Sequence, residues 1–470
     1  MSITQPNILL IHVDQQRYDC LGFTGHPQVK TPNLDHLRSQ GMSFTNAFTP
    51  CPLCCPARQT QLSGVMPEVH GGLWNYDSQA IPGLSPEFTT WTELLKKQGY
   101  QMAYFGKWHV SPEHDPTAFG YDSYQPQAGW LPEKRIKRYD LPDNPVWPHT
   151  GYVDDSELKD TLTHTLAASA CESIQSCALK REQKGRPWHI RFDLSEPHLP
   201  CVPAEPFASM YKPADMKEWS NFKDSFENKP FIQKQQLKNW CIDEWDWEEW
   251  SVYVALYFGI ISQVDDAVGR VLDALEATGQ SENTIVVYTT DHGDAAGSHG
   301  MIDKHYVMYE EEVHVPLLVR WPGQVAADST CEDFISNGLD LGPTLLEACG
   351  VAIPETFQGK SFLPQLRGKQ TENGWPVAFS TYNGQQFGLY NMRMIRDKRY
   401  KYIWNPTDID EFYDLDEDPT ELVNLAGSEV DRQLGPSYRK KLGELFASLE
   451  DRLITKSHWM QHNLNCSSEK

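Results

Sequence analysis

Short apolar segments alternate with longer segments of helical periodicity over the first two thirds of the chain. Each apolar segment is bounded by polar residues, glycine or proline, as the buried strands of a parallel sheet are. The predicted strands are 8–13, 101–105, 189–194, 284–289 and 315–320. The predicted helices are 33–40, 90–98, 154–180, 250–277 and 339–348. This alternation predicts a doubly wound α/β fold, with a mostly parallel sheet covered by helices on both faces.

The pattern changes after about residue 368. Short strands are predicted at 376–382, 388–395 and 400–404, and a closing helix at 439–452. We therefore predict a large α/β domain over residues 1–368 and a smaller C-terminal α+β subdomain over 369–470. Residues 205–250 fit neither pattern and indicate an insertion over the main sheet. Their tryptophans can pack under a helix or stack on a ligand, and we expect mainly packing.

Charge and hydropathy narrow the range of partners. The chain carries 41 lysines and arginines against 64 acidic residues, a net charge of −23. This field repels nucleic acid and anionic lipid, so we expect neither as a partner, and an anionic substrate needs cations placed locally. The longest apolar segments, 7–13 and 252–261, are shorter than the roughly 20 residues of a membrane span. The N-terminus lacks signal-peptide features, so we expect a cytoplasmic protein, although a signal removed earlier is compatible with the sequence.

Two predicted strands end in an acidic residue followed by a second polar ligand. Asp14-Gln15 follows the first strand, and Asp291-His292 follows the strand at 284–289. Ligands of open α/β sheets bind at the carboxyl ends of the strands, where these side chains meet. Such oxygen and imidazole donors favour Ca²⁺, Mg²⁺ or Mn²⁺. The alternative is that both aspartates only cap the helices that follow.

The chain has eleven cysteines, an odd number, and their scattered positions do not resemble those of a disulfide scaffold. One cluster, at residues 51–55, differs from the others. Within it, Cys54-Cys55-Pro56-Ala57-Arg58 resembles the Cys-x-Pro-x-Arg signature of the formylglycine-dependent (type I) sulfatases of the alkaline phosphatase superfamily. In that family the cysteine is oxidised to an aldehyde residue. The alternative is that Cys51 and Cys54 form a CxxC redox pair or half of a zinc site. The sequence contains no second CxxC.

Further segments resemble the same family in the family's order, from about residue 7 to 425. The Asp-Gln and Asp-His pairs are similar to those of choline sulfatases and phosphonate monoester hydrolases. The remaining matching segments are 31–35, 44–47, Gly106-Lys107-Trp108-His109, Glu196-Pro197-His198, 290–294, 299–304, 340–346 and 413–419. The resemblance implies an alkaline-phosphatase-like fold and a sulfuric ester hydrolase.

The resemblance also implies roles for the site residues. Cys54 would become formylglycine and, with Asp14, Gln15, Asp291 and His292, hold one divalent cation. Ca²⁺ is expected, with Mg²⁺ or Mn²⁺ as alternatives. Arg58 would fix the modified side chain, Lys107 and Lys304 would bind the sulfate, His109 would act as base, and His198 would bind the ester and protonate the leaving oxygen. Each lysine and histidine has the alternative of an ordinary structural role.

These roles lead to three hypotheses about function. The first is hydrolysis of a sulfate monoester of a carbohydrate or small alcohol. The second is a phosphonate monoester or phosphodiester hydrolase that uses the same site. The third is a non-catalytic binding protein in which Cys54 stays a thiol. The expected partners are a small-molecule or saccharide sulfate ester and a formylglycine-generating maturation enzyme, and a homo-oligomer is compatible with the sequence.

Overall fold

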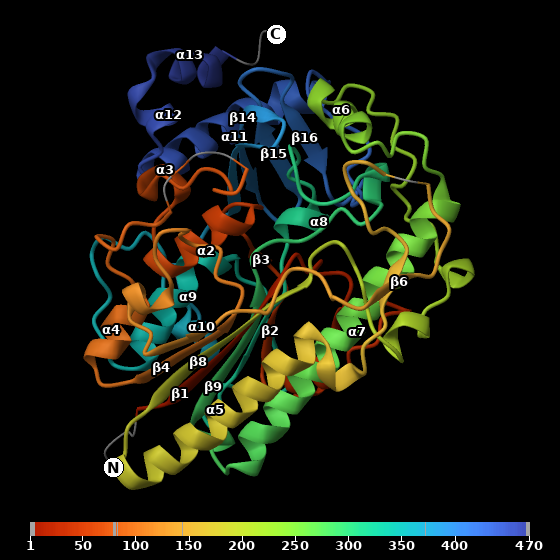
Figure 1. Cartoon of the computed structure of the whole chain (residues 1–470). Helices are drawn as coiled ribbons and strands as arrows, with labels where there is room; N and C mark the ends of the chain where they lie inside the picture. The colour runs from red at the N-terminus through yellow and green to blue at the C-terminus, as the bar shows by residue number, and fades with distance from the viewer. Residues whose placement is uncertain (1–4, 79–80, 82, 143, 372, 467–470) are drawn as a thin grey trace.

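An eight-stranded sheet forms the centre of the molecule (Figure 1). The computed structural model describes residues 5–466 except 79–80, 82, 143 and 372. The strand order is β11-β2-β10-β9-β1-β8-β4-β5. Parallel pairing joins β9, β1, β8, β4 and β5, which confirms the predicted mostly parallel sheet. The strands are β1 (Asn7–Asp14), β2 (Met42–Phe44), β4 (Gln101–Gly106), β5 (Ser123–Gln125), β8 (Trp188–Pro197), β9 (Thr284–Thr290), β10 (Leu317–Arg320) and β11 (Ser329–Cys331).

The two faces of the sheet carry separate layers of helices (Figure 1). Along β1, Leu9, Ile11 and Val13 pack with residues of α1, α5 and α7, whereas Ile8 and Leu10 pack on the side of α4 and α9. Because both faces are covered, β1 is apolar at four successive positions, Ile8 to Ile11, instead of alternating. The covering helices are α1 (Pro32–Ser39), α5 (Leu162–Lys184) and α7 (Trp247–Ala277) on one face, and α2 (Cys54–Ser63), α4 (Trp91–Lys97), α9 (Asn337–Ala348) and α10 (Leu363–Leu366) on the other.

Strand β10 differs from the expectation of a parallel strand at 315–320. It pairs antiparallel with both β9 and β2. The connection from β9 contains only the short helix α8 (Glu310–Val313) and the 3₁₀ turn Ser298–Gly300. A parallel return needs a crossover that brings the chain back to the starting edge, usually through a long helix. Here the connection stays at the carboxyl edge, so the chain re-enters the sheet from that edge and runs the other way.

Helix α5 begins later than the predicted 154. Tyr152–Asp154 forms strand β7, which pairs with β6 (Arg135–Lys137), so these residues are extended. The Thr161 side chain then accepts a hydrogen bond from the backbone N–H of His164 and caps the helix. Such a cap satisfies one of the backbone donors left free at a helix start.

The C-terminal part of the chain forms an antiparallel sheet in the order β13-β14-β15-β16. Its strands are β13 (Ala378–Gln385), β14 (Gly388–Arg396), β15 (Tyr400–Trp404) and β16 (Glu411–Asp414). The predicted closing helix at 439–452 is α11 (Glu429–Ser448), which starts earlier because Ser428 caps it. Helices α12 (Arg452–Lys456) and α13 (His458–Cys466) follow, and Figure 1 shows them at the C-terminal end of the molecule. The domain boundary at 368 stays a prediction.

The tryptophan-rich segment 205–250 mainly packs, as expected. Trp250 is fully buried and Trp240 is 5% exposed, and both belong to the core on the α7 side of the sheet. The segment contains α6 (Phe231–Asn239), where Gln233 donates a hydrogen bond to Glu411 of β16. Within the described part of the chain, no helix combines the length and apolar character that crossing a membrane requires. The short strands β3 (Ala47–Phe48) and β12 (Ile335–Ser336) form a separate parallel pair, and the short helix α3 (Pro67–His70) follows α2.

Candidate active site

The ends of β1 and β9 meet the start of α2 at one edge of the sheet. Ligand atoms of Asp14, Cys54, Asp291 and His292 all lie within 4.8 Å of one another, and all four residues are buried. Cys54 Sγ lies 3.2 Å from His292 Nε2 and 3.6 Å from Asp14 Oδ1. Residues separated by more than two hundred positions therefore converge on the cysteine. The strand-end pattern predicts that Asp14 and Asp291 meet, and the family resemblance implies that Cys54 lies with them.

Helix α2 places Cys54 and Arg58 on the same side. Cys54 is the first residue of the helix, and Arg58 follows four positions later, which is about one turn. The guanidinium donates to Asp291 Oδ2, Asp14 Oδ2 and Asp193 Oδ1, each at 2.8 Å. Arg58 thus joins three strand-end carboxylates to the helix that carries Cys54.

Asp193 is a site residue that the sequence reasoning missed. It lies in β8, between β1 and β4, and also accepts a hydrogen bond from Arg191 Nε at 2.7 Å. Burial raises its pKa, but Arg58 and Arg191 outweigh this and keep the carboxyl ionised. The signal that identified Asp14, an acidic residue near the carboxyl end of a buried strand, was also present here.

The four converging residues fit a divalent cation. Arg58 occupies one oxygen of Asp14 and one of Asp291, so Oδ1 of each carboxylate faces His292 Nε2, at 3.9 and 3.7 Å. His292 Nδ1 lies 2.9 Å from the Gly293 carbonyl, which makes Nδ1 the protonated nitrogen and leaves a lone pair on Nε2. Burial also lowers the pKa of His292 and so favours the neutral, ligating form. Two carboxylate oxygens and an imidazole nitrogen are suitable ligands for such an ion.

Gln15 sits beside this cluster in a left-handed backbone conformation, with φ of 66°. Its Nε2 donates to Asp294 Oδ2 at 2.6 Å, which fixes the amide, and its Oε1 accepts from Lys304 Nζ at 3.0 Å. Its backbone N–H donates to Asp291 Oδ1 at 3.1 Å. Gln15 therefore orients the cluster in this structure, and coordination of an ion through Oε1 stays a prediction.

Two buried lysines bring positive charge to the cluster. Lys107 Nζ is 2.6 Å from Asp14 Oδ2, and Lys304 Nζ is 2.9 Å from Asp303 Oδ1. Burial alone would lower both pKa values, but Asp14 raises the pKa of Lys107 and Asp303 raises that of Lys304. Both side chains are therefore cations, as binding of a sulfate group requires.

His198 and His109 face the same cavity from different loops. Lys304 Nζ donates to His198 Nε2 at 2.8 Å, while His198 Nδ1 lies 2.6 Å from the Leu199 carbonyl. Burial and the charge of Lys304 hold the pKa of His198 well below its usual range. His109 has a left-handed backbone, with φ of 46°, and its Nε2 lies 3.5 Å from Asp77 Oδ1. Such a conformation in a residue other than glycine is typical of functional sites.

Except for Arg58, which is fully buried, the predicted catalytic residues line one cavity of about 620 Å³. Gln385 and Gln386, from the β13–β14 hairpin, also reach it. The sequence reasoning missed Trp130, whose ring lies 4.6 Å from Lys107 Nζ and 4.7 Å from the ring of His198. The lining includes Cys54, Tyr76, Asp77, Lys107, His109, Trp130, Trp147, His198, Trp240, Lys304 and His305.

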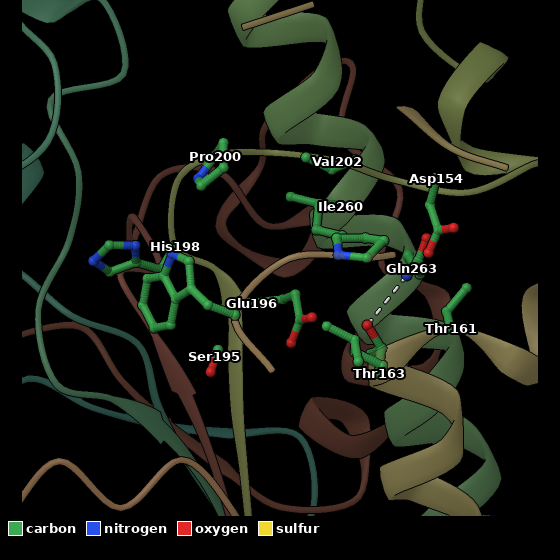
Figure 2. A pocket seen from close by; sticks show the side chains of 13 residues that line it. Asp154, Thr161, Thr163, Ser195, Glu196, His198, Pro200, Val202, Ile260 and Gln263 are labelled. Atoms are coloured by element: carbon green, nitrogen blue, oxygen red, sulfur yellow. Dashed lines mark hydrogen bonds between the residues drawn. The ribbon is translucent and has the colours of Figure 1, made fainter. Parts of the chain in front are cut away.

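A much smaller cavity, of about 20 Å³, lies behind His198. Figure 2 shows Glu196, near the end of β8, directed toward Thr163 and Gln263, whereas His198, just after the strand, points the other way. Thr163 and Gln263 are joined by a hydrogen bond of 3.1 Å. Burial raises the pKa of Glu196 to about 7. The volume suffices for a single water molecule, so this cavity is not a substrate site.

Comparison with known proteins identifies the family. A model described as Sulfatase matches residues 6–351, and one described as N-sulphoglucosamine sulphohydrolase, C-terminal, matches residues 297–448. The chain belongs to the sulfatase family. It is therefore a sulfuric ester hydrolase of the alkaline phosphatase superfamily, as the motifs indicated.

Individual relatives match over nearly their whole length. The arylsulfatase of Clostridium perfringens is 29% identical over 93% of this chain and 94% of its own. The Delta 4,5-hexuronate-2-O-sulfatase of Bacteroides thetaiotaomicron is 29% identical over 96% and 89%. The crystal structure of the phosphonate monoester hydrolase of Agrobacterium radiobacter has a TM-score of 0.79 and 26% identity over 95% and 96%.

Proposed function

We propose that this sulfatase hydrolyses the sulfate monoester of a small hydroxylated alcohol, in particular a sugar, after Cys54 has been converted to formylglycine. The observation that carries the proposal is the position of Cys54, 3.2 Å from His292 Nε2 and 3.6 Å from Asp14 Oδ1. The same cavity presents Lys107, Lys304, His109 and His198. A nucleophile, a cation site and groups for sulfate binding and proton transfer are thus close together.

Maturation changes only the side chain of residue 54. The CH₂–SH group becomes CHO by a two-electron oxidation at Cβ, in which the sulfur leaves as sulfide and the oxygen is gained from water. The electrons pass to an external oxidant, such as dioxygen, through a dedicated maturation enzyme. An unmodified thiol would leave the site without its activated nucleophile.

The first half of the reaction transfers the sulfuryl group to residue 54. A divalent cation held by Asp14, Asp291, His292, Gln15 and residue 54 would withdraw charge from the sulfate and lower the pKa of a hydroxyl on the hydrated aldehyde. Lys107 and Lys304 neutralise the sulfate oxygens as that hydroxyl forms the new bond to sulfur. His198 is assigned the transfer of a proton to the alcohol oxygen as its bond to sulfur breaks, which requires Nε2 to take up a proton when the sulfate ester draws Lys304 away from it.

The second half releases sulfate without attack by water on sulfur. His109 takes the proton of the remaining hydroxyl on residue 54, and the electron pair of that O–H bond forms the carbonyl. The bond between Cβ and the sulfate oxygen then breaks, and the sulfate leaves with its electron pair. The aldehyde is restored and is ready for hydration.

The walls of the cavity support a sugar as the alcohol. Trp130 is 45% exposed although its ring lies against Lys107 and His198, so a flat apolar surface is available beside the sulfate position. Aromatic rings commonly stack on the apolar faces of sugars, and the polar side chains of Gln385 and His305 border the same space. The relative named Delta 4,5-hexuronate-2-O-sulfatase also supports a saccharide ester.

A second candidate is hydrolysis of phosphonate monoesters or phosphodiesters. It is favoured by the likeness to the phosphonate monoester hydrolase of Agrobacterium radiobacter and by the Gln15 and His292 pair at the cation site. The divalent cation and the two lysines would stabilise a phosphoryl group by the same electrostatic means.

Two measurements test the proposal. Mass spectrometry of the peptide that contains Cys54 should show a loss close to the mass of one water molecule, which hydration of the aldehyde restores. Assays with matched aryl sulfate, phosphate diester and phosphonate monoester substrates should then show a preference for sulfate in the converted protein. A strong preference for a phosphodiester would favour the second candidate, and a wholly unmodified, inactive native protein would favour the binding hypothesis.

A further inference from the structure

A second group of metal-binding side chains lies next to the catalytic cluster. Cys55, Asp77 and His109 offer a sulfur, an oxygen and a nitrogen that all lie within 4.8 Å of one another. His109 Nε2 and Asp77 Oδ1 are 3.5 Å apart. Neither Cys55 nor Asp77 belongs to the predicted ligands of the catalytic cation.

The three side chains are arranged from solvent inward. Asp77 is 62% exposed and His109 is 14% exposed, and both line the substrate cavity. Cys55 is fully buried beneath them in the first turn of α2. Its backbone N–H donates to Asn75 Oδ1 at 2.9 Å, which ties the loop carrying Asp77 to the helix. An ion that enters the cavity therefore meets Asp77 and His109 before it reaches the thiol.

We propose that Cys55, Asp77 and His109 form a binding site for a thiophilic divalent cation such as Zn²⁺ or Cd²⁺. One thiolate, one imidazole and one carboxylate, with water in the fourth position, make a tetrahedral set that suits zinc. Ca²⁺ and Mg²⁺ prefer oxygen ligands and do not select a thiolate. Binding releases the thiol proton to solvent and forms a metal–sulfur bond without any change of oxidation state.

An ion at this site inhibits the sulfatase reaction, a consequence that rests on the proposed function. The imidazole of His109 then coordinates the metal and no longer takes the proton from the second hydroxyl of residue 54. Transfer of the sulfuryl group does not need that proton transfer, whereas release of sulfate does. The zinc-loaded enzyme therefore releases one equivalent of alcohol in a burst and then stops with the sulfate bound to residue 54.

Binding can be tested independently of catalysis. In a Cys54→Ser background no thiol remains in the catalytic cluster, and Cd²⁺ should produce an ultraviolet thiolate-to-metal charge-transfer band. Cys55→Ser should remove this band and weaken binding by at least about 10- to 100-fold, the loss caused by removing even groups that only orient metal ligands. Cys241→Ser is the matched control, because it removes an exposed thiol outside the group and should leave the band unchanged. A band that survives Cys55→Ser would overturn the proposal.

Asp77→Asn provides a second variant at an exposed position, where a folding defect is not expected. It should weaken Cd²⁺ binding while circular dichroism stays unchanged, and Cd²⁺ affinity that is the same as in the parent protein would overturn the three-ligand site. In the mature enzyme, Zn²⁺ inhibition should be relieved by Cys55→Ser and not by Cys241→Ser. Inhibition that is equal in both variants would place the ion elsewhere. Turnover of a sulfate ester by the mature enzyme loaded with Ca²⁺, in the absence of Zn²⁺, tests the proposed function separately.

Discussion

Replacement of Arg58 by methionine should destabilise the protein through a single uncompensated carboxylate. Arg58 bonds three aspartates at 2.8 Å, and two of them keep another cation. Asp14 retains Lys107 at 2.6 Å, and Asp193 retains Arg191 at 2.7 Å. Among the described residues, no second lysine or arginine forms an ion pair with Asp291.

The expected loss in the free energy of unfolding follows from these ion pairs. Leaving one buried charge without its partner costs about 3–5 kcal/mol in the free energy of unfolding, so three broken bonds do not cost three times that amount. The parent protein and the Arg58→Met variant should both carry Cys54→Ser, so that maturation does not differ between them. A chelator should be present to remove divalent cations. Urea unfolding followed by the fluorescence of the 15 tryptophans measures the loss.

The loss should depend on pH in a defined direction. Burial raises the pKa of Asp14 and Asp193, but the cations around them outweigh it and leave both values below normal. A lowered carboxyl pKa stabilises the fold above the unfolded value of about 4, and the stabilisation disappears as the pH falls. Because Arg58 is one of the cations that lower these two pKa values, Arg58→Met removes part of this stabilisation. The difference between parent and variant should therefore be widest near neutral pH and narrow progressively below about pH 5.

A matched control and an added ion complete the test. Arg270→Met breaks an exposed pair with Asp266 on helix α7, whose two side chains are 49% and 37% exposed, and should cost less than about 1 kcal/mol. Saturating Ca²⁺ should reduce the loss caused by Arg58→Met, because the ion supplies countercharge to Asp14 and Asp291. A loss below about 1 kcal/mol for Arg58→Met, or one that does not change with pH, would refute the charge-compensation argument.

Three further predictions concern activity. Cys54→Ala should abolish turnover of an aryl sulfate while circular dichroism still reports a folded protein, because it removes the nucleophile; near-normal rates would disprove the assignment. Asp291→Ala should lose the bound divalent ion, measured by elemental analysis, together with activity, because its carboxylate lies within 4.8 Å of the other three ligand atoms; full activity without the ion would contradict the proposed cation site. Trp130→Ala should raise KM for a saccharide sulfate by about tenfold, through loss of roughly 1–1.5 kcal/mol of ring contact, with little change for a small alkyl sulfate. Trp459→Ala, at a 74% exposed position on α13, is its control, and equal effects of the two substitutions would contradict a role for Trp130 in binding the sugar.

Some features of the fold and the site could be predicted from residues that are neighbours in the sequence. A strand covered on both faces is apolar at successive positions, which made β1 and β9 recognisable, whereas β8 alternates apolar and polar residues. The polar residue that follows such a strand must lie at the carboxyl edge, which located Asp14 and Asp291. The spacing of Cys54 and Arg58 equals about one helical turn, so their common direction also followed from the sequence.

Features that depend on contacts between residues distant in the sequence could not be predicted from the sequence. Asp193 carries the same strand-end signal as Asp14, but its link to the site depends on Arg58, which reaches it from α2. The direction of β10 depends on where the preceding loop lies, and no residue within β10 specifies it. Trp130 belongs to a loop without motifs, and its place beside Lys107 results from the packing of that loop over the site.

The sequence alone therefore determined the alternating elements, the Asp-Gln and Asp-His pairs at the strand ends and the cysteine signature of the family, because each depends on neighbours along the chain. Only the tertiary structure decided which carboxylates share Arg58, which nitrogen of His292 faces Asp14 and Asp291, and which aromatic side chains line the cavity. Those choices depend on side chains from separate elements competing for the same few ångströms, and folding brings these elements together.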